Sequence, residues 1–258
     1  MPIEKTFDPA PGMLSPAHIA SPVPGFPETV VVTFSPLLVD LMTKKGGREQ
    51  ISELHAGYTL PIYRFTHEGH PLGAYFSPLG GSACGALMEE VIAKGARRFL
   101  FFGSCGTLEK GVDAGHIIVP TAAWRDEGTS YHYLPASDEV AVPTAPTLCR
   151  VLDALAVPYR TGKTWTTDGF YRETAGNAEK RRQAGCLCVE MECASVMAIG
   201  QFRRIPVYQF VYGADSLSGE SWDPRILGSV SSDLKEHLAR LALSVAVRLK
   251  DAEKSENA

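Results

Sequence analysis

The chain has 258 residues, of which 45% are hydrophobic and 21% are charged, as is typical of soluble globular proteins. This composition excludes disordered and fibrous proteins, and the length is sufficient to bury a substantial apolar core. The 25 Lys and Arg residues against 29 Asp and Glu residues give a net charge of -4, which provides no general attraction for nucleic acid or for an anionic membrane. We therefore expect a small-molecule partner.

The N-terminal segment, residues 1–28, is rich in Pro and Ser and predicts an extended arm. The arm lacks the apolar run behind a basic segment that marks a secretory signal. No stretch of the chain reaches the roughly 20 apolar residues that a membrane span requires. We therefore expect a cytoplasmic protein that binds neither membranes nor nucleic acid.

The six cysteines are too few for a disulfide framework in a chain of this length. Cys186, Cys188 and Cys193 lie close together in the sequence, but no second paired cluster or nearby His completes a tetrahedral metal site. Small buried thiols are the commoner explanation of this pattern, so we expect no bound metal.

Beyond the arm, short apolar runs alternate with amphipathic segments. In chain order, the pattern predicts strands over 30–35, 72–77, 97–104, 115–124, 159–168, 186–192 and 207–216. It predicts helices over 36–45, 83–95, 145–155, 173–185, 193–204 and 230–250. A turn that begins at residue 105 closes the strand over 97–104. This alternation predicts an α/β fold. We find no internal repeat or long linker, and expect one domain over residues 29–250 followed by a polar tail over 251–258.

Two groups of glycines follow predicted strands. Gly80 and Gly81 precede one predicted helix, and Gly103 and Gly106 flank Ser104 after another strand. Glycine allows backbone amides to approach an anion closely, and Ser104 adds a hydroxyl donor. Strand-to-helix turns also use glycine for geometry alone, so the spacing leaves both interpretations open.

Glu190 and Glu192 stand on either side of Met191 at the predicted end of a strand. Alternation along a strand places both carboxylates on one face. Two acids on one face of an apolar strand are costly unless they bind a partner, which indicates a polar ligand such as a sugar diol. Alternatively, the two carboxylates cap the helix that follows.

Asp215 and Phe170 are two further candidates. Asp215 lies at the end of an apolar strand, where α/β proteins place ligand-binding residues, although aspartate there also serves as a helix cap or turn residue. Phe170 and its neighbour Tyr171 offer a flat apolar surface to a ligand, although aromatic residues after a strand also pack in the core.

Four motifs occur in the order seen in nucleoside phosphorylases: GSCGTLEKGVDAGHIIVPTAAWRDEGTSYHYLP (103–135), TTDGFY (166–171), VEMECAS (189–195) and GADS (213–216). From about His18 to the C-terminal helix, the chain resembles the branch of the nucleoside phosphorylase superfamily that contains the hexameric purine nucleoside phosphorylases and the uridine phosphorylases. The resemblance implies a single three-layer α/β/α domain with a mixed, partly barrel-like central sheet. It also implies assembly as a homodimer or homohexamer.

The resemblance also implies the roles of individual side chains. Asp215 matches the acid that protonates or hydrogen-bonds N7 of a purine, and Glu192 matches the carboxylate that holds the ribose hydroxyls, so these two residues are the catalytic candidates. Met191 resembles the residue that packs under the ribose. Glu190 lies near the base in this comparison, and Phe170 matches the aromatic residue that stacks on it.

Two further matches concern the remainder of the substrate site, and the glycine spacing adds Gly81 as a candidate for substrate binding. Ser104 resembles a hydroxyl donor to phosphate. His18 resembles the histidine that reaches the sugar 5′-hydroxyl of a neighbouring subunit. The active sites are therefore expected to be shared between protomers.

The family's phosphate-binding arginines are absent from their usual positions. Leu38 and Phe101 stand where two of them are expected, and the arginine supplied by a partner subunit aligns nearest Tyr58. A phosphate dianion requires cationic donors, because amides alone seldom compensate for its transfer from water. Arg48, Arg64 and Arg125 are the candidates to replace these arginines.

The expected activity is cleavage of the N-glycosidic bond of a purine nucleoside, or of uridine, to give free base and sugar 1-phosphate. Inorganic phosphate is the expected co-substrate, and we expect no other cofactor. Asp215 favours a purine, whereas TTDGFY looks closer to the uridine branch. The alternatives are a nucleosidase that uses water and a non-catalytic protein that binds or stores a nucleoside.

Overall fold

The computed structural model describes residues 3–55 and 59–254, so Tyr58 lies outside the described residues. The strands are β1 (Thr29–Thr33), β2 (Glu49–Leu54), β3 (Leu60–His67), β4 (His70–Phe76), β5 (Arg98–Thr107), β6 (Ile117–Asp126), β7 (Glu139–Ala141), β8 (Tyr159–Thr167), β9 (Cys186–Glu190) and β10 (Val207–Ser216). The α-helices are α1 (Pro36–Thr43), α2 (Gly81–Lys94), α3 (Ala145–Ala154), α4 (Ala175–Gln183), α5 (Cys193–Arg203) and α6 (Ser232–Lys254). Four short 3-10 helices complete the set in the described part of the chain: η1 (Ile3–Lys5), η2 (Pro16–His18), η3 (Thr129–His132) and η4 (Phe170–Arg172).

The strands of the described residues form one mixed sheet in the order β10-β6-β8-β9-β5-β1-β4-β3-β2, with β7 attached to β6. Strand β10 also pairs with β5, so that β5, β10, β6, β8 and β9 close into a ring. Strand β1 runs parallel to β4 and β5, whereas β3 runs antiparallel to both β4 and β2. The expected mixed, partly barrel-like sheet is confirmed.

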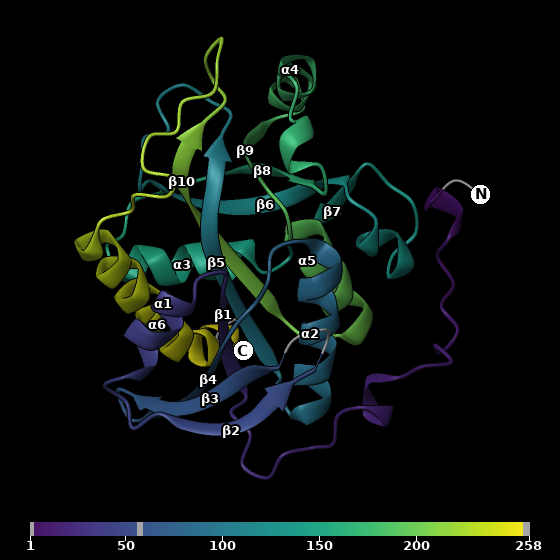
Figure 1. Cartoon of the computed structure of the whole chain (residues 1–258), viewed down its shortest axis with the longest axis vertical. Helices are drawn as coiled ribbons and strands as arrows, with labels where there is room; N and C mark the ends of the chain where they lie inside the picture. Colours follow the sequence, from purple (N-terminus) through teal and green to yellow (C-terminus); the bar gives the residue numbers. More distant parts are fainter. Residues whose placement is uncertain (1–2, 56–58, 255–258) are drawn as a thin grey trace.

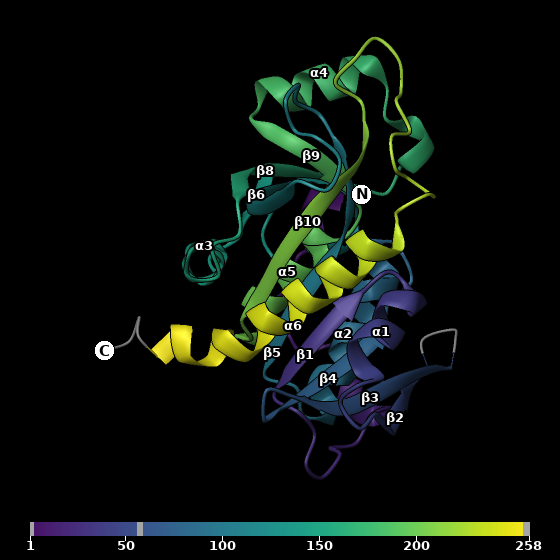
Figure 2. The ribbon, with the colours of Figure 1, turned by 90° about the vertical axis from the view of Figure 1, so that its left-hand side faces the viewer.

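Helices cover both faces of this sheet. Figure 1 shows α1, α3 and α6 on one side and α2 with α5 on the other, and Figure 2 shows α6 passing in front of β1, β5 and β10. Helices α2 and α5 pack against each other, as do α3 and α6. The expected three-layer α/β/α arrangement is confirmed.

The interior is apolar and continuous. The main cluster of buried hydrophobic residues begins at Val30 and ends at Leu249. At its centre Phe102 of β5 stacks on Phe210 of β10, with ring centroids 5.4 Å apart. Close packing of such rings fixes the two parallel strands relative to each other, and these strands carry site residues at their carboxyl ends.

Strand β5 is longer than expected. A turn was predicted from residue 105, but the strand continues to Thr107. It does so because Gly106 pairs with Val189 of β9 on one side and with Asp215 of β10 on the other. Three segments that are far apart in the sequence therefore meet at one point.

The two ends of the chain differ in structure. The described part of the arm contains η1 and η2, and the Val23 amide donates to the Lys94 carbonyl at 2.9 Å. Helix α6 continues through Lys254, so the first residues of the predicted polar tail are helical. The helix continues because Glu253 binds the buried Arg98, whose Nε lies 2.7 Å from Glu253 Oε1, and accepts a hydrogen bond from Tyr208.

Candidate active site

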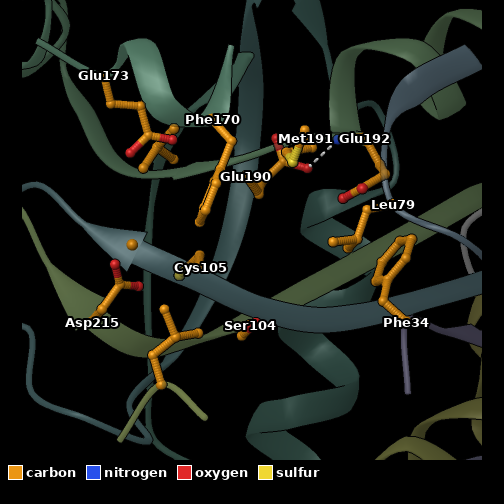
Figure 3. Close-up of a pocket in the computed structure, with 13 residues that line it drawn as sticks. Phe34, Leu79, Ser104, Cys105, Phe170, Glu173, Glu190, Met191, Glu192 and Asp215 are labelled. Carbon is orange, nitrogen blue, oxygen red and sulfur yellow. Dashed lines mark hydrogen bonds between the residues drawn. The ribbon is translucent and has the colours of Figure 1, made fainter. Parts of the chain in front are cut away.

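A pocket opens where β5 and β10 end side by side and β9 crosses the end of β5 (Figure 3). Open α/β sheets bind ligands at this kind of position, outside the carboxyl ends of strands. The pocket is lined by Phe34, Leu79, Ser104, Cys105, Gly106, Phe170, Glu173, Val189, Glu190, Met191, Glu192, Asp215 and Leu227. The structure therefore brings together six residues expected from the sequence: Ser104, Phe170, Glu190, Met191, Glu192 and Asp215.

Glu192 is the N-cap residue of α5 and is 3% exposed. Its Oε1 accepts a hydrogen bond from the Gly80 amide at 2.7 Å. Burial and then the charge of Glu190 raise the pKa of Glu192 to about 8, while the Gly80 amide opposes the shift. This carboxyl group is therefore anchored by the Gly80 amide at the edge of the pocket and has a pKa above neutrality.

Glu190 is the last residue of β9, and its carboxylate binds the protein itself. It accepts hydrogen bonds from the amides of Glu192 and Cys193, at 2.9 and 2.7 Å, and from Thr166 Oγ1 at 2.6 Å. Strand alternation does not relate the two acids, because the strand ends at Glu190 and Glu192 belongs to the helix cap. Of the two interpretations offered by the sequence, helix capping is the one that the contacts of Glu190 support.

Asp215 lies within β10, next to its final residue, and is 7% exposed. The Trp222 indole donates to Asp215 Oδ2 at 2.7 Å, so the carboxylate is neither a helix cap nor a turn residue. Burial raises the pKa of Asp215, and the Trp222 hydrogen bond opposes this shift. Asp215 is thus a buried acid at one end of the pocket.

Phe170 and Met191 supply apolar surface. Phe170 begins η4 and is 46% exposed, so its ring is not part of the core. Figure 3 shows this ring projecting into the middle of the pocket, with Asp215 and Glu173 toward one end and Met191, Glu192 and Leu79 toward the other. A planar ligand can therefore stack on Phe170 while its two ends meet different acids.

Gly81 and His18 do not line the pocket. A Cβ atom on Gly81 would lie 2.1 Å from Ser195 Oγ, so glycine here permits the close approach of α2 to α5. His18 is exposed at the end of η2, where its Nδ1 accepts a hydrogen bond from the Ser15 amide at 3.1 Å. The role of His18 in a neighbouring subunit stays a prediction.

The positions expected to hold phosphate arginines are apolar. Leu38 and Phe101 are buried in the main core. The replacement candidates are engaged elsewhere: Arg48 pairs with Asp40, Arg64 with Glu49 at 2.6 Å, and Arg125 donates to Ser130 and to the Pro135 carbonyl. Among the described residues that line the pocket there is no Lys, Arg or His.

Glu173 is a lining residue that the sequence analysis missed. It directly follows η4 and is half-buried, close enough to Asp215 to feel its charge. Burial and then the Asp215 carboxylate raise the pKa of Glu173 to about 7. The sequence placed this residue at the start of a polar helix, and its only signal was its position three residues after Phe170.

The cysteines are free thiols, and Cys186, Cys188 and Cys193 are all buried. Within residues 3–55 and 59–254, no group of three or more His, Cys, Asp or Glu side chains is placed to hold a metal ion. None of the helices in this same part of the chain is long and apolar enough to cross a bilayer.

Comparison with known proteins matches residues 28–246 to the family described as the phosphorylase superfamily. The chain is 35% identical over 109 residues to a uridine phosphorylase of Thermococcus kodakarensis, a match covering 41% of this chain and 39% of the relative. It is 28% identical over 143 residues to a guanosine phosphorylase of Halorubrum lacusprofundi. It is 30% identical over 146 residues to a purine nucleoside phosphorylase of Plasmodium vivax. Each of these two matches covers 54% of this chain and 59% of the relative. The matched segment thus spans about half the length of these curated relatives. Because the family match extends over most of its length, the chain belongs to the phosphorylase superfamily.

Proposed function

We propose that this protein cleaves the N-glycosidic bond of a nucleoside with inorganic phosphate, giving free base and sugar 1-phosphate. The observation that carries the proposal is the meeting of Phe170, Met191, Glu192 and Asp215 in one pocket, with Ser104 beside them. These residues come from four separate segments of a chain that belongs to the phosphorylase superfamily. A purely structural role would not require them to converge.

The arrangement suits the charge changes of the reaction. As the glycosidic bond stretches, positive charge develops on the sugar and negative charge on the base. Met191 and Glu192 lie at the end of the pocket where the sugar would bind, and Asp215 lies at the end where the base would stack on Phe170. Acids at the base end can neutralise the departing base, and holding both reactants together supplies ~7 kcal/mol or more.

For the base, we propose a purine. The support is the carboxyl group of Asp215, buried at the base end of the pocket, where it can meet the N7 edge of a purine. Relatives named for uridine, guanosine and purine nucleosides all match the chain, so uridine is the second candidate.

For phosphate, we propose that the Ser104 hydroxyl group and a neighbouring subunit together complete the site. The described lining residues offer four acids and no cation, and phosphate binds poorly without a cationic partner. A homodimer or homohexamer with shared active sites would supply donors from outside this chain. His18, exposed on η2 and outside its own pocket, is the residue that we assign to the sugar 5′-hydroxyl group of a neighbour.

The test is release of free base from a panel of purine and pyrimidine nucleosides, with and without phosphate, while the sugar product is identified. We expect base release from purine nucleosides that depends on phosphate and yields sugar 1-phosphate. Equal rates without phosphate, with free sugar as the product, would overturn phosphorolysis. Binding of nucleosides without any turnover would overturn the enzymatic proposal altogether.

A further inference from the structure

Four carboxyl groups line the pocket, and the protein holds three of them. Glu190 is bound by the first amides of α5, Glu192 by the Gly80 amide, and Asp215 by the Trp222 indole. Glu173 differs from them, because within the described part of the chain its carboxyl group has no hydrogen bond and no ion pair. A half-buried acid that faces a pocket without a protein partner is available to a ligand.

We propose that Glu173 is the residue that protonates the departing base, with Asp215 at the same end of the pocket as a hydrogen-bond acceptor. This assignment rests on the proposed function and adds to it a catalytic residue. The geometry that supports it is the position of both acids at the base end of the pocket, where Figure 3 shows Glu173 above and Asp215 below on the same side of the Phe170 ring. Glu173 follows η4 directly, so the element that presents the stacking ring also positions this acid.

The surroundings decide which acid carries the proton. Two neighbouring carboxyl groups in a poorly solvated pocket resist ionising together. Burial raises the pKa of Asp215 and Asp223 acts in the same direction, whereas the Trp222 N–H group and the positive charge of Arg225 oppose the rise by stabilising the ionised form. Glu173 has no such donor, and burial with the Asp215 charge raises its pKa to about 7.

This pKa suits proton transfer near neutral pH. The other acids that line the described pocket are Glu190 and Glu192, and Asp215 is the one whose charge raises the pKa of Glu173 in addition to burial. An acid whose pKa lies near the working pH is both populated with its proton and ready to lose it. Glu173 therefore holds its proton below pH 7 and loses it as the pH rises above that value.

When a purine nucleoside reacts, the bond between C1′ and N9 breaks, and its electron pair moves onto the base. The proton on the Glu173 carboxyl group passes to N7, while a phosphate oxygen forms the new bond to C1′. The base leaves as a neutral N7–H tautomer, and the Glu173 carboxylate, which is partly exposed, regains its proton from solvent.

The experiment compares the wild type with Glu173→Gln, which keeps the shape of the side chain but has no transferable proton. The control is Glu179→Gln, an exposed acid on α4 outside the pocket. With adenosine and phosphate, we expect kcat/KM of Glu173→Gln to fall about 100-fold, and Glu179→Gln to match the wild type. With 7-methylguanosine, whose base already carries a positive charge and leaves without a proton, we expect a loss below about threefold.

The pH profile is the second readout. Wild-type kcat/KM for adenosine should fall as the pH rises above about 7, and Glu173→Gln should lack this alkaline limb. Glu173→Asp keeps a titratable group one methylene further away, so we expect a smaller loss with the alkaline limb retained. If wild type cleaves adenosine while Glu173→Gln stays within threefold of it, or loses both substrates equally, the assignment is wrong. If wild type cleaves no nucleoside, the proposed function itself fails.

Discussion

The four acids of the pocket show how partners give one residue type different tasks. Glu190 is saturated by amides and a hydroxyl group, which makes it structural. Asp215 has one oxygen fixed by the Trp222 indole, and its carboxyl group lines the pocket. Glu173 makes no hydrogen bond within the described residues and has a raised pKa. Chemical identity alone does not assign these roles, whereas hydrogen-bond partners do.

A pair of carboxyl groups with one proton offers a base one donor and one acceptor. The edge of adenine presents N7 as an acceptor and its amino group as a donor, whereas 6-oxopurines present two acceptors there. If Asp215 is ionised beside a protonated Glu173, the pocket should prefer adenosine to inosine. We expect Asp215→Asn to reduce the ratio of kcat/KM for adenosine over inosine at least tenfold, since the amide can donate to O6.

The measurement is the kcat/KM of both nucleosides for wild type and Asp215→Asn, with Asp233→Asn as the matched control. Asp233 is exposed in the first turn of α6 and is not part of the lining. An unchanged ratio in Asp215→Asn would show that this carboxyl group does not contact the six-position of the purine.

At the scale of elements, the sequence predicted the strands and helices that pack in the core. Runs such as 98–107 and 207–216 are apolar because both faces of these strands are covered. Strands β2 and β3 were missed, because β2 is a polar edge strand and β3 contains Pro61, both of which hide a strand pattern. The candidate site divides in a similar way. Residues at the ends of buried strands were predicted from the sequence, whereas Glu173 was missed because it follows a short 3-10 helix.

The junction of β9 and α5 gives a prediction about stability. Glu190 accepts from two amides of α5 and from Thr166, so Glu190→Ala leaves these buried donors without a partner. We expect Glu190→Ala to lower the free energy of unfolding by about 3 kcal/mol. Glu190→Gln retains an acceptor oxygen and should cost only about 1 kcal/mol. Urea unfolding measures both values, and equal losses would show that capping is not the function of this carboxylate.

At the scale of the molecule, the described lining of the pocket offers no positive charge. This lining is acidic and apolar, although a phosphate dianion needs positive charge.

Leu79 is 65% exposed and lies at the sugar end of the pocket, so a cation can be introduced there without disturbing the core. We expect Leu79→Arg to lower KM for phosphate about tenfold. Leu79→Gln adds a polar group without charge, and an equal change in both variants would contradict the electrostatic explanation.

The proposed sharing of active sites between subunits can be tested with two inactive variants. On this proposal, Glu192→Ala removes a group from the subunit that binds the sugar, and His18→Ala removes a group that the neighbouring subunit supplies. In a mixed dimer with reciprocal sites, one site carries both substitutions and the other carries neither. Dissociating and reassembling an equal mixture should therefore restore about a quarter of the wild-type activity. If the mixture stays as inactive as its components although heterodimers form, each subunit works alone, and His18 acts within its own chain or not at all.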